Sequence, residues 1–370
     1  MPDVIIRKAG YDPKTLKPIL SEMIDAMIKG RIPKGARVLI KPNLLLPAKP
    51  DKAIITHPLV VKAVSEYVVD CGASVTIQDS PAMGTFDRVL TEGGYREVFD
   101  NLDVTFAPFK TSVRKDIGSP FGAIDIAKEA VEADLVINIA KLKTHSQMLL
   151  TLGVKNLFGC IVGYRKPEWH FRSGVDREMF AALLVQIYRA IQPGLTIIDG
   201  ILAMEGQGPG RSGVPREVGV LLAGRNAAAT DLAVCNMLGI DPDRLPTHKA
   251  AKAMALVKGT LSIDGDLPRI DGFRQPVLAP LTFGPKRFQG LMRKHLLQRP
   301  VVIPKLCRRC GECWQYCPAK AIEPGTETIL FNYADCIRCY CCIEVCPHGA
   351  LRSKETLPGK LIRKLPLFNR

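Results

Sequence analysis

The sequence predicts an α/β protein with two parts. The first is a large domain whose mostly parallel sheet is flanked by helices, and the second is a small, cysteine-rich α+β domain. Val- and Ile-rich stretches alternate with helix-like stretches over residues 1–266, a pattern typical of a parallel sheet. Nine of the 12 cysteines then fall between Cys307 and Cys346. A chain of 370 residues has room for both parts.

Short apolar runs define the strands of the large domain, and apolar residues at helical spacing define its helices. The predicted strands are 38–40, 74–77, 135–139, 195–198 and 218–223, and the clearest helices are 58–70 and 227–238. Pro42 should end the first strand, because proline cannot donate to a strand ladder. Parallel sheets of this kind bind ligands beyond the carboxyl ends of their strands, so the polar residues there are candidate ligands.

The alternating pattern ends near residue 266, and a proline-rich connector is predicted over residues 267–302. Within it, residues 286–299 read as a basic amphipathic helix. Such a helix either packs against the large domain, which we favour, or lies on a membrane surface. The cysteine-rich domain is expected over residues 303–352, followed by a basic tail over 353–370.

Charge and hydropathy exclude several classes of protein. No apolar run is long enough to cross a membrane, and no secretory signal is recognisable, so a cytoplasmic location is expected. The net charge is +15, of which +10 belongs to residues 285–370. Basic charge alone could indicate nucleic-acid binding, but no recognition module accompanies it, and we expect no nucleic-acid partner.

The cysteines form two copies of one motif, offset by 29 residues. The first copy is Cys307-x2-Cys310-x2-Cys313-x3-Cys317-Pro318, and the second is Cys336-x2-Cys339-x2-Cys342-x3-Cys346-Pro347. Two zinc knuckles are the alternative, but these usually consist of paired CxxC motifs. The duplicated run instead resembles a bacterial-type ferredoxin domain with two 4Fe-4S clusters.

The resemblance implies which cysteines hold each cluster, because the last cysteine of each run binds the cluster of the other run. Cys307, Cys310, Cys313 and Cys346 would hold the first cluster, and Cys336, Cys339, Cys342 and Cys317 the second. Cys341 lies outside the pattern; it is either a small buried apolar residue, which we favour, or a reserve ligand.

Three stretches of the large domain carry a second resemblance. They are Lys41-Pro-Asn43, then Ala140-Lys-Leu-Lys-Thr-His145 with Gly153-Val-Lys-Asn-Leu-Phe-Gly159, and then Asp199-Gly200 with Met204-Glu-Gly-Gln-Gly-Pro209. Together they resemble the domain-of-unknown-function family 362, which is often joined to a ferredoxin module. The family label implies the architecture but no reaction.

The large domain therefore has to be interpreted from its residues. Cationic and amide side chains near the predicted strand ends favour an anionic small-molecule ligand. The candidate binding residues are Lys41, Asn43, Lys143, Lys155 and Asn156. His145 and Lys143 are candidates for proton transfer or catalysis, and Glu205 is a candidate second acid–base group on a glycine-rich loop.

Two functions remain open at this point. In the first, the chain is an iron–sulfur redox enzyme that acts on an anionic molecule in the large domain. In the second, it is an electron carrier or scaffold subunit that docks to a partner oxidoreductase, and its basic end attracts an acidic protein. No flavin, haem or nicotinamide motif is visible, so the sequence leaves open whether the chain is an enzyme.

Overall fold

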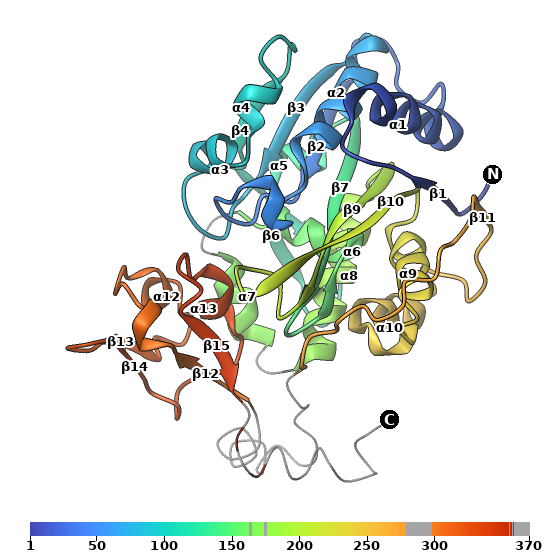
Figure 1. The fold of residues 1–370 in the computed structure, drawn as a ribbon. Helices are drawn as coiled ribbons and strands as arrows, with labels where there is room; N and C mark the ends of the chain where they lie inside the picture. Colours follow the sequence, from blue (N-terminus) through green and yellow to red (C-terminus); the bar gives the residue numbers. More distant parts are fainter. Residues whose placement is uncertain (163–164, 174–175, 279–297, 355, 357, 359–370) are drawn as a thin grey trace.

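The computed structural model describes residues 1–162, 165–173, 176–278, 298–354, 356 and 358. Within these residues, one nine-stranded sheet runs through the large domain in the order β11-β1-β10-β9-β7-β2-β3-β4, with β8 paired to β7 (Figure 1). Its strands are β1 Val4–Lys8, β2 Arg37–Pro42, β3 Ser74–Asp79, β4 Thr105–Pro108, β7 Leu135–His145, β8 Leu149–Thr151, β9 Leu195–Gly206, β10 Gly213–Gly224 and β11 Ile263–Asp264.

The central strands of this sheet run in one direction. β4, β3, β2, β7 and β9 are parallel neighbours, whereas β10 is antiparallel to both β9 and β1. The prediction of an α/β fold with a mostly parallel sheet is therefore confirmed. β2 and β7 are adjacent, with Lys41 opposite Asn138, so their carboxyl ends open on the same edge of the sheet.

Helices cover both faces of the sheet because successive strand residues point to opposite sides. Val38 and Ile40 of β2 face one apolar core, and Leu39 between them faces another. The first core contains α1 Pro13–Ile28, α2 Pro58–Asp70, α3 Phe86–Glu92 and α4 Tyr95–Val98. The other face is covered by α5 Lys128–Glu132, α6 Gly153–Asn156, α7 Arg165–Ser173, α8 Arg177–Ile191, α9 Ala227–Met237 and α10 Pro246–Ala253. A hairpin of β5 Ser112–Asp116 and β6 Ala123–Ala127 lies outside the main sheet.

The strands are longer than the apolar runs that predict them. β2 ends at Pro42 as expected, but Lys41 belongs to the strand and does not follow it. β7 continues from the predicted end at residue 139 to His145, and its lysines are buried. The apolar pattern misses this extension because polar side chains can remain in a buried strand when other buried groups bind them.

The cysteine-rich domain is a small module with an internal repeat. β12 Arg299–Val302 pairs with β15 Leu351–Lys354, and a hairpin joins β13 Ile322–Pro324 to β14 Ile329–Phe331. Its helices, α12 Glu312–Gln315 and α13 Cys341–Val345, begin 29 residues apart. Left-handed backbone positions repeat at the same offset in the pairs Arg309 and Arg338, Gly311 and Tyr340, and Lys320 and Gly349. The sequence duplication is therefore also a duplication of backbone conformation.

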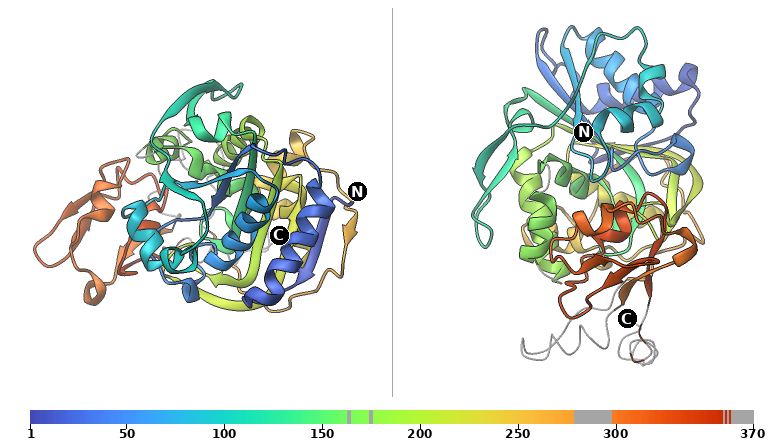
Figure 2. Two further views of the ribbon diagram at one scale, coloured as in Figure 1. Left: turned by 90° about the horizontal axis from the view of Figure 1, so that it is seen from above. Right: turned by 90° about the vertical axis from the view of Figure 1, so that its left-hand side faces the viewer.

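The module lies against one end of the large domain, beside α7 (Figures 1 and 2). Val345 of α13 belongs to the same apolar core as helices α1 and α2, so the module is packed on the large domain. Most of the predicted amphipathic helix at 286–299 lies outside the described residues. No helix in the part of the chain that the structure describes is long and apolar enough to cross a membrane.

Candidate functional site

The eight motif cysteines gather into two groups, and each group contains one cysteine from the opposite run. Cys307, Cys310, Cys313 and Cys346 line one small cavity. The Cys317 thiol interacts electrostatically with Cys336 and Cys339, and the Cys342 thiol interacts with all three. This grouping agrees with the crossing that the motif implies, and the assignment of ligands to each cluster stays a prediction.

The donor chemistry of both groups suits iron–sulfur clusters. Among the described residues no three His, Cys, Asp or Glu side chains could hold a single metal ion. The Ala321 N–H donates to Cys317 Sγ at 3.4 Å, and the Ala350 N–H donates to Cys346 Sγ at 3.2 Å. Backbone donors of this kind stabilise thiolate sulfur.

A second cavity lies between the module and the large domain, and its volume is about 70 Å³. We call it the interdomain cavity. The large domain contributes Asn43, Leu45, Asp79, Ser80, Ala82, Lys143, Thr151, Lys155, Asn156, Phe158, Gly159, Lys166, His170 and Pro209, and the module contributes Tyr316, Cys341 and Glu344. Cys341 is therefore buried at this cavity, and its thiol interacts with those of Cys339 and Cys342.

Four of the five predicted binding residues line the interdomain cavity, and hydrogen bonds connect three of them. Lys143 Nζ donates to Asn43 Oδ1 at 2.8 Å, and Asn43 Nδ2 donates to Asn156 Oδ1 at 2.9 Å. Lys143 Nζ also donates to the Ile54 carbonyl at 2.7 Å. Burial, and then the nearby charge of Lys155, holds the pKa of Lys143 well below its usual range. The Lys143 amino group is thus anchored in the protein frame of the cavity.

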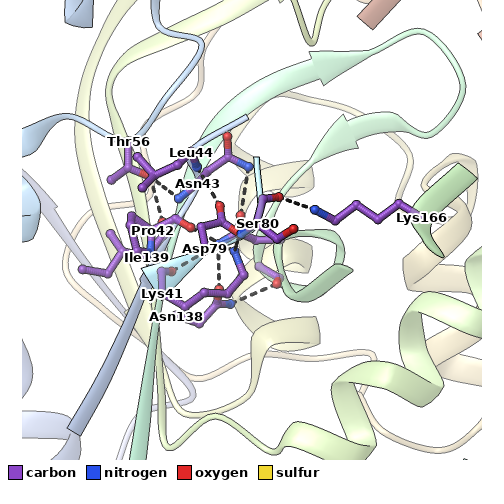
Figure 3. Close-up of polar contacts among 12 residues, drawn as sticks. Lys41, Pro42, Asn43, Leu44, Thr56, Asp79, Ser80, Asn138, Ile139 and Lys166 are labelled. Atoms are coloured by element: carbon purple, nitrogen blue, oxygen red, sulfur yellow. Dashed lines mark hydrogen bonds and ion pairs between the residues drawn. The ribbon is translucent and has the colours of Figure 1, made fainter. Parts of the chain in front are cut away.

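The fifth predicted residue, Lys41, does not line the cavity and instead contacts Asp79 (Figure 3). Its Nζ is 2.9 Å from Asp79 Oδ1, and the side chains are 0% and 5% exposed. Asp79 also accepts hydrogen bonds from the backbone N–H groups of Leu44 and Ser80, both at 2.8 Å. A Cβ at Gly159 would collide with this ion pair, so the glycine allows the backbone to pass close to it.

His145 connects the two domains. Its Nε2 is 3.0 Å from Glu344 Oε1 of α13, although the pair is not aligned as a hydrogen bond. His145 Nδ1 accepts from the backbone N–H groups of Gln147 and Met148, both at 3.1 Å. The proton of a neutral imidazole is therefore on Nε2 and faces the module. Burial, and then the charge of Lys155, lowers the pKa of His145 to about 4, so the ring is neutral at pH 7.

The structure places Glu205 away from the interdomain cavity. Its carboxylate is 3.0 Å from Arg216 and 2.5 Å from Arg274, and it also accepts from the Arg274 backbone N–H at 3.0 Å. Burial opposes ionisation, but the Arg274 backbone N–H and the two arginine side chains outweigh it and lower the pKa of Glu205. Glu205 thus attaches the first part of the connector, through Arg274, to strand β9.

Lys141 and Asp199 form a second buried ion pair, 2.8 Å apart, with both side chains 0% exposed. The Tyr11 hydroxyl donates to Asp199 Oδ1 at 2.8 Å and accepts from Lys141 Nζ at 2.9 Å. His57 caps α2, accepting from the Leu59 N–H, and its ring stacks on Tyr11. The charges of Lys141 and Asp199 neutralise each other, and neither residue lines the interdomain cavity.

Several cavity residues are absent from the sequence predictions. Lys166 and His170 lie one helical turn apart on α7, and Glu344 and Tyr316 come from the module. Asp79 ends strand β3, so the rule that placed ligands at strand ends could have found it. The i, i+4 spacing of Lys166 and His170 is a signal only when the segment is known to be helical.

Comparisons with known proteins agree with this architecture. Residues 38–236 match the family model described as "Domain of unknown function (DUF362)", and residues 299–347 match a "4Fe-4S dicluster domain". Thylakoid-associated protein sll1697 of Synechocystis sp. is 36% identical over 308 residues, which is 81% of this chain and 96% of that protein.

Shorter similarities each cover 16% of this chain. Hydrogenase-4 component A of Escherichia coli is 37% identical over 60 residues, which is 29% of that protein. Pyruvate synthase subunit PorD of Thermotoga maritima is 37% identical over 59 residues, or 60% of that protein. The C-terminal module is therefore an iron–sulfur, ferredoxin-like electron-transfer domain, and the chain belongs to the DUF362 family.

Proposed function

We propose that the chain is an iron–sulfur redox enzyme whose C-terminal module exchanges electrons with a small anionic molecule held in the interdomain cavity. One observation carries this proposal. Cys341, which directly precedes the motif cysteine Cys342, lines the same cavity as Lys143 and Lys155 of the large domain. A molecule bound there would lie beside the second cysteine run. The clusters, when bound, supply one-electron transfer.

The residues around the cavity favour an anion. Lys143, Lys155 and Lys166 bring three amino groups, while Lys41 already neutralises Asp79. The carboxylate that remains is Glu344, so amino groups outnumber unpaired carboxylates in the lining. Lysine residues attract anions from a distance and offer up to three donors each.

The alternative is an electron carrier or scaffold subunit that docks to a partner oxidoreductase. Two similar proteins are named as a hydrogenase component and a pyruvate synthase subunit, which favours a redox partner protein for this module. The two functions differ in what reoxidises the reduced chain. An enzyme needs a small molecule, whereas a carrier needs a protein.

The test uses anaerobically reduced protein, freed of excess reductant, mixed with a protein-free ultrafiltrate of the source cells. We expect cluster absorbance to recover within minutes, and Lys155→Met to slow the recovery at least tenfold. Lys128→Met, an exposed lysine of α5, is the matched control and should behave like the wild type. Recovery with the protein fraction alone would reject the enzyme and support the carrier.

Anion binding in the cavity should weaken as pH rises through 8. Burial lowers the pKa of Lys166 to about 8, with Lys41 and Lys155 acting in the same direction and Asp79 and Cys160 opposing them. The ammonium form is present below this pKa and is lost above it. The dissociation constant should therefore increase about tenfold between pH 7 and pH 9. Calorimetry at both values tests this, and Lys166→Met should remove that part of the dependence.

Association with an acidic redox partner should weaken with salt. Residues 285–370 carry a net charge of +10, and two bound clusters would leave about +6. Exposed charges steer encounter and are screened over about 8–10 Å at ordinary ionic strength. Stopped-flow reduction by an acidic flavodoxin should slow as salt is raised from low to physiological levels. A constant rate would indicate an apolar docking surface instead.

A cytoplasmic location stays a prediction. The similar protein from Synechocystis is named as thylakoid-associated, so contact of this chain with a membrane surface is the alternative. Flotation of the purified protein with anionic vesicles distinguishes the two. We expect the protein to remain in the unbound fraction.

A further inference from the structure

Three side chains that line the interdomain cavity each have a donor group without a hydrogen-bond partner among the described residues. The donor atoms are Thr151 Oγ1, His170 Nδ1 and Lys155 Nζ. Thr151 and His170 are 3% and 5% exposed, so bulk water does not satisfy them. A buried polar atom without a partner costs free energy, and it marks a place where something else binds.

Each of the three groups comes from a different element, so their convergence does not follow from local geometry. Thr151 ends β8, Lys155 lies on α6 and His170 lies on α7. The His170 ring is fixed between Phe158 and Phe180, with centroid distances of 5.5 and 4.3 Å. Burial lowers the pKa of His170 to about 3, so its ring is neutral and carries one N–H donor.

The size of the cavity limits its occupant. At about 10–15 Å³ of cavity for each water-sized group, 70 Å³ accepts about five non-hydrogen atoms. Phe158, Pro209 and Tyr316 form less polar parts of the wall. Nucleotides and dinucleotides are several times larger than this space.

We propose that the interdomain cavity binds an oxyanion or carboxylate of about five non-hydrogen atoms through Lys155 Nζ, Thr151 Oγ1 and His170 Nδ1. This inference rests on the proposed function. It adds the chemical class of the molecule that exchanges electrons with the module. The donors supply one charge-assisted and two neutral hydrogen bonds, which suits a group with several acceptor oxygens. The anion also compensates the buried lysines, whose charge is costly without it.

Calorimetry on the oxidised holo-protein at pH 7 tests directly whether the cavity binds small oxyanions or carboxylates. The probes are formate, nitrate, glyoxylate and phosphate, with citrate and AMP as larger anions. We expect at least one small probe to bind and both larger anions to fail at about 10 mM. Lys155→Met should raise the dissociation constant of that probe at least tenfold, and Thr151→Val about fivefold. Lys155→Arg should recover part of the affinity, and Lys128→Met should leave it unchanged.

Two results would overturn the inference: AMP or citrate binding as tightly as the best small probe, or wild-type affinity in both Lys155→Met and Thr151→Val. Cluster absorbance shows whether each variant is folded. If Lys155→Met does not fold, Thr151→Val still tests the inference, because valine has nearly the same shape as threonine. Binding is measured without electron transfer, so the two proposals can fail separately. Small anions that bind but never reoxidise the reduced chain would reject only the proposed function.

Discussion

Replacing Cys317 with alanine should lower the iron content of anaerobically prepared protein from about eight to about four atoms per chain. Cys317 belongs to the first run, yet its thiol lies with Cys336 and Cys339 of the second. Its loss should therefore remove the cluster of the second run and leave that of the first. Iron and sulfide analysis, with the absorbance near 400 nm, measures the effect.

Cys341→Ala is the matched control, because Cys341 is a buried thiol within the second run that lies outside the cysteine motif. It should retain about eight irons. If Cys341→Ala loses iron and Cys317→Ala does not, then the ligand assignment is wrong and Cys341 is a ligand. Zinc in place of iron in the wild-type protein would reject both clusters.

Lys41→Met should destabilise the large domain by about 3–5 kcal/mol, because it leaves the Asp79 carboxylate buried without its counter-charge. For a domain of this size, that corresponds to a fall in melting temperature of about 10 °C. Thermal melting at a fixed scan rate measures it. Figure 3 shows why the loss cannot relax locally: Asp79 is also held by the backbone of Leu44 and Ser80.

The double variant Lys41→Met/Asp79→Leu provides the control for that effect. Removing both charges should recover part of the stability, since no unpaired ion remains in the interior. A shift below about 2 °C in Lys41→Met would show that the ion pair contributes little. Lys41 would then be free to act as the ligand-binding residue that its place at a strand end predicts.

Apolar patterning predicted strands β2, β3, β7, β9 and β10 and helices α2 and α9 of the large domain, but it gave no prediction for β1, β4, α1 or α8. Helix 58–70 begins and ends as predicted, because Pro58 and Gly72 mark its two limits. The pattern failed where buried strands carry charge. β7 is six residues longer than its apolar run, since buried partners such as Asp199 and Asn43 bind its lysines. Such partners lie far apart in the sequence, so periodicity cannot reveal them.

The candidate site was predictable only in part, for a similar reason. The rule that parallel sheets bind ligands at the carboxyl ends of neighbouring strands predicted that Asn43, Lys143 and Asn156 lie close together, and all three line the interdomain cavity. Glu344 and Cys341 reach that edge from the other domain, and a single sequence carries no signal of how two domains pack. The internal repeat was easier, since ligand spacing within one run is local.

We infer that the interdomain cavity and the second cysteine run form one site. Electron paramagnetic resonance of the reduced holo-protein, with and without the small oxyanion that binds best, tests it most directly. We expect one of the two cluster signals to change on binding, and it should be the signal that is missing in Cys317→Ala. Unchanged spectra under saturating anion, or a change confined to the other cluster, would contradict it.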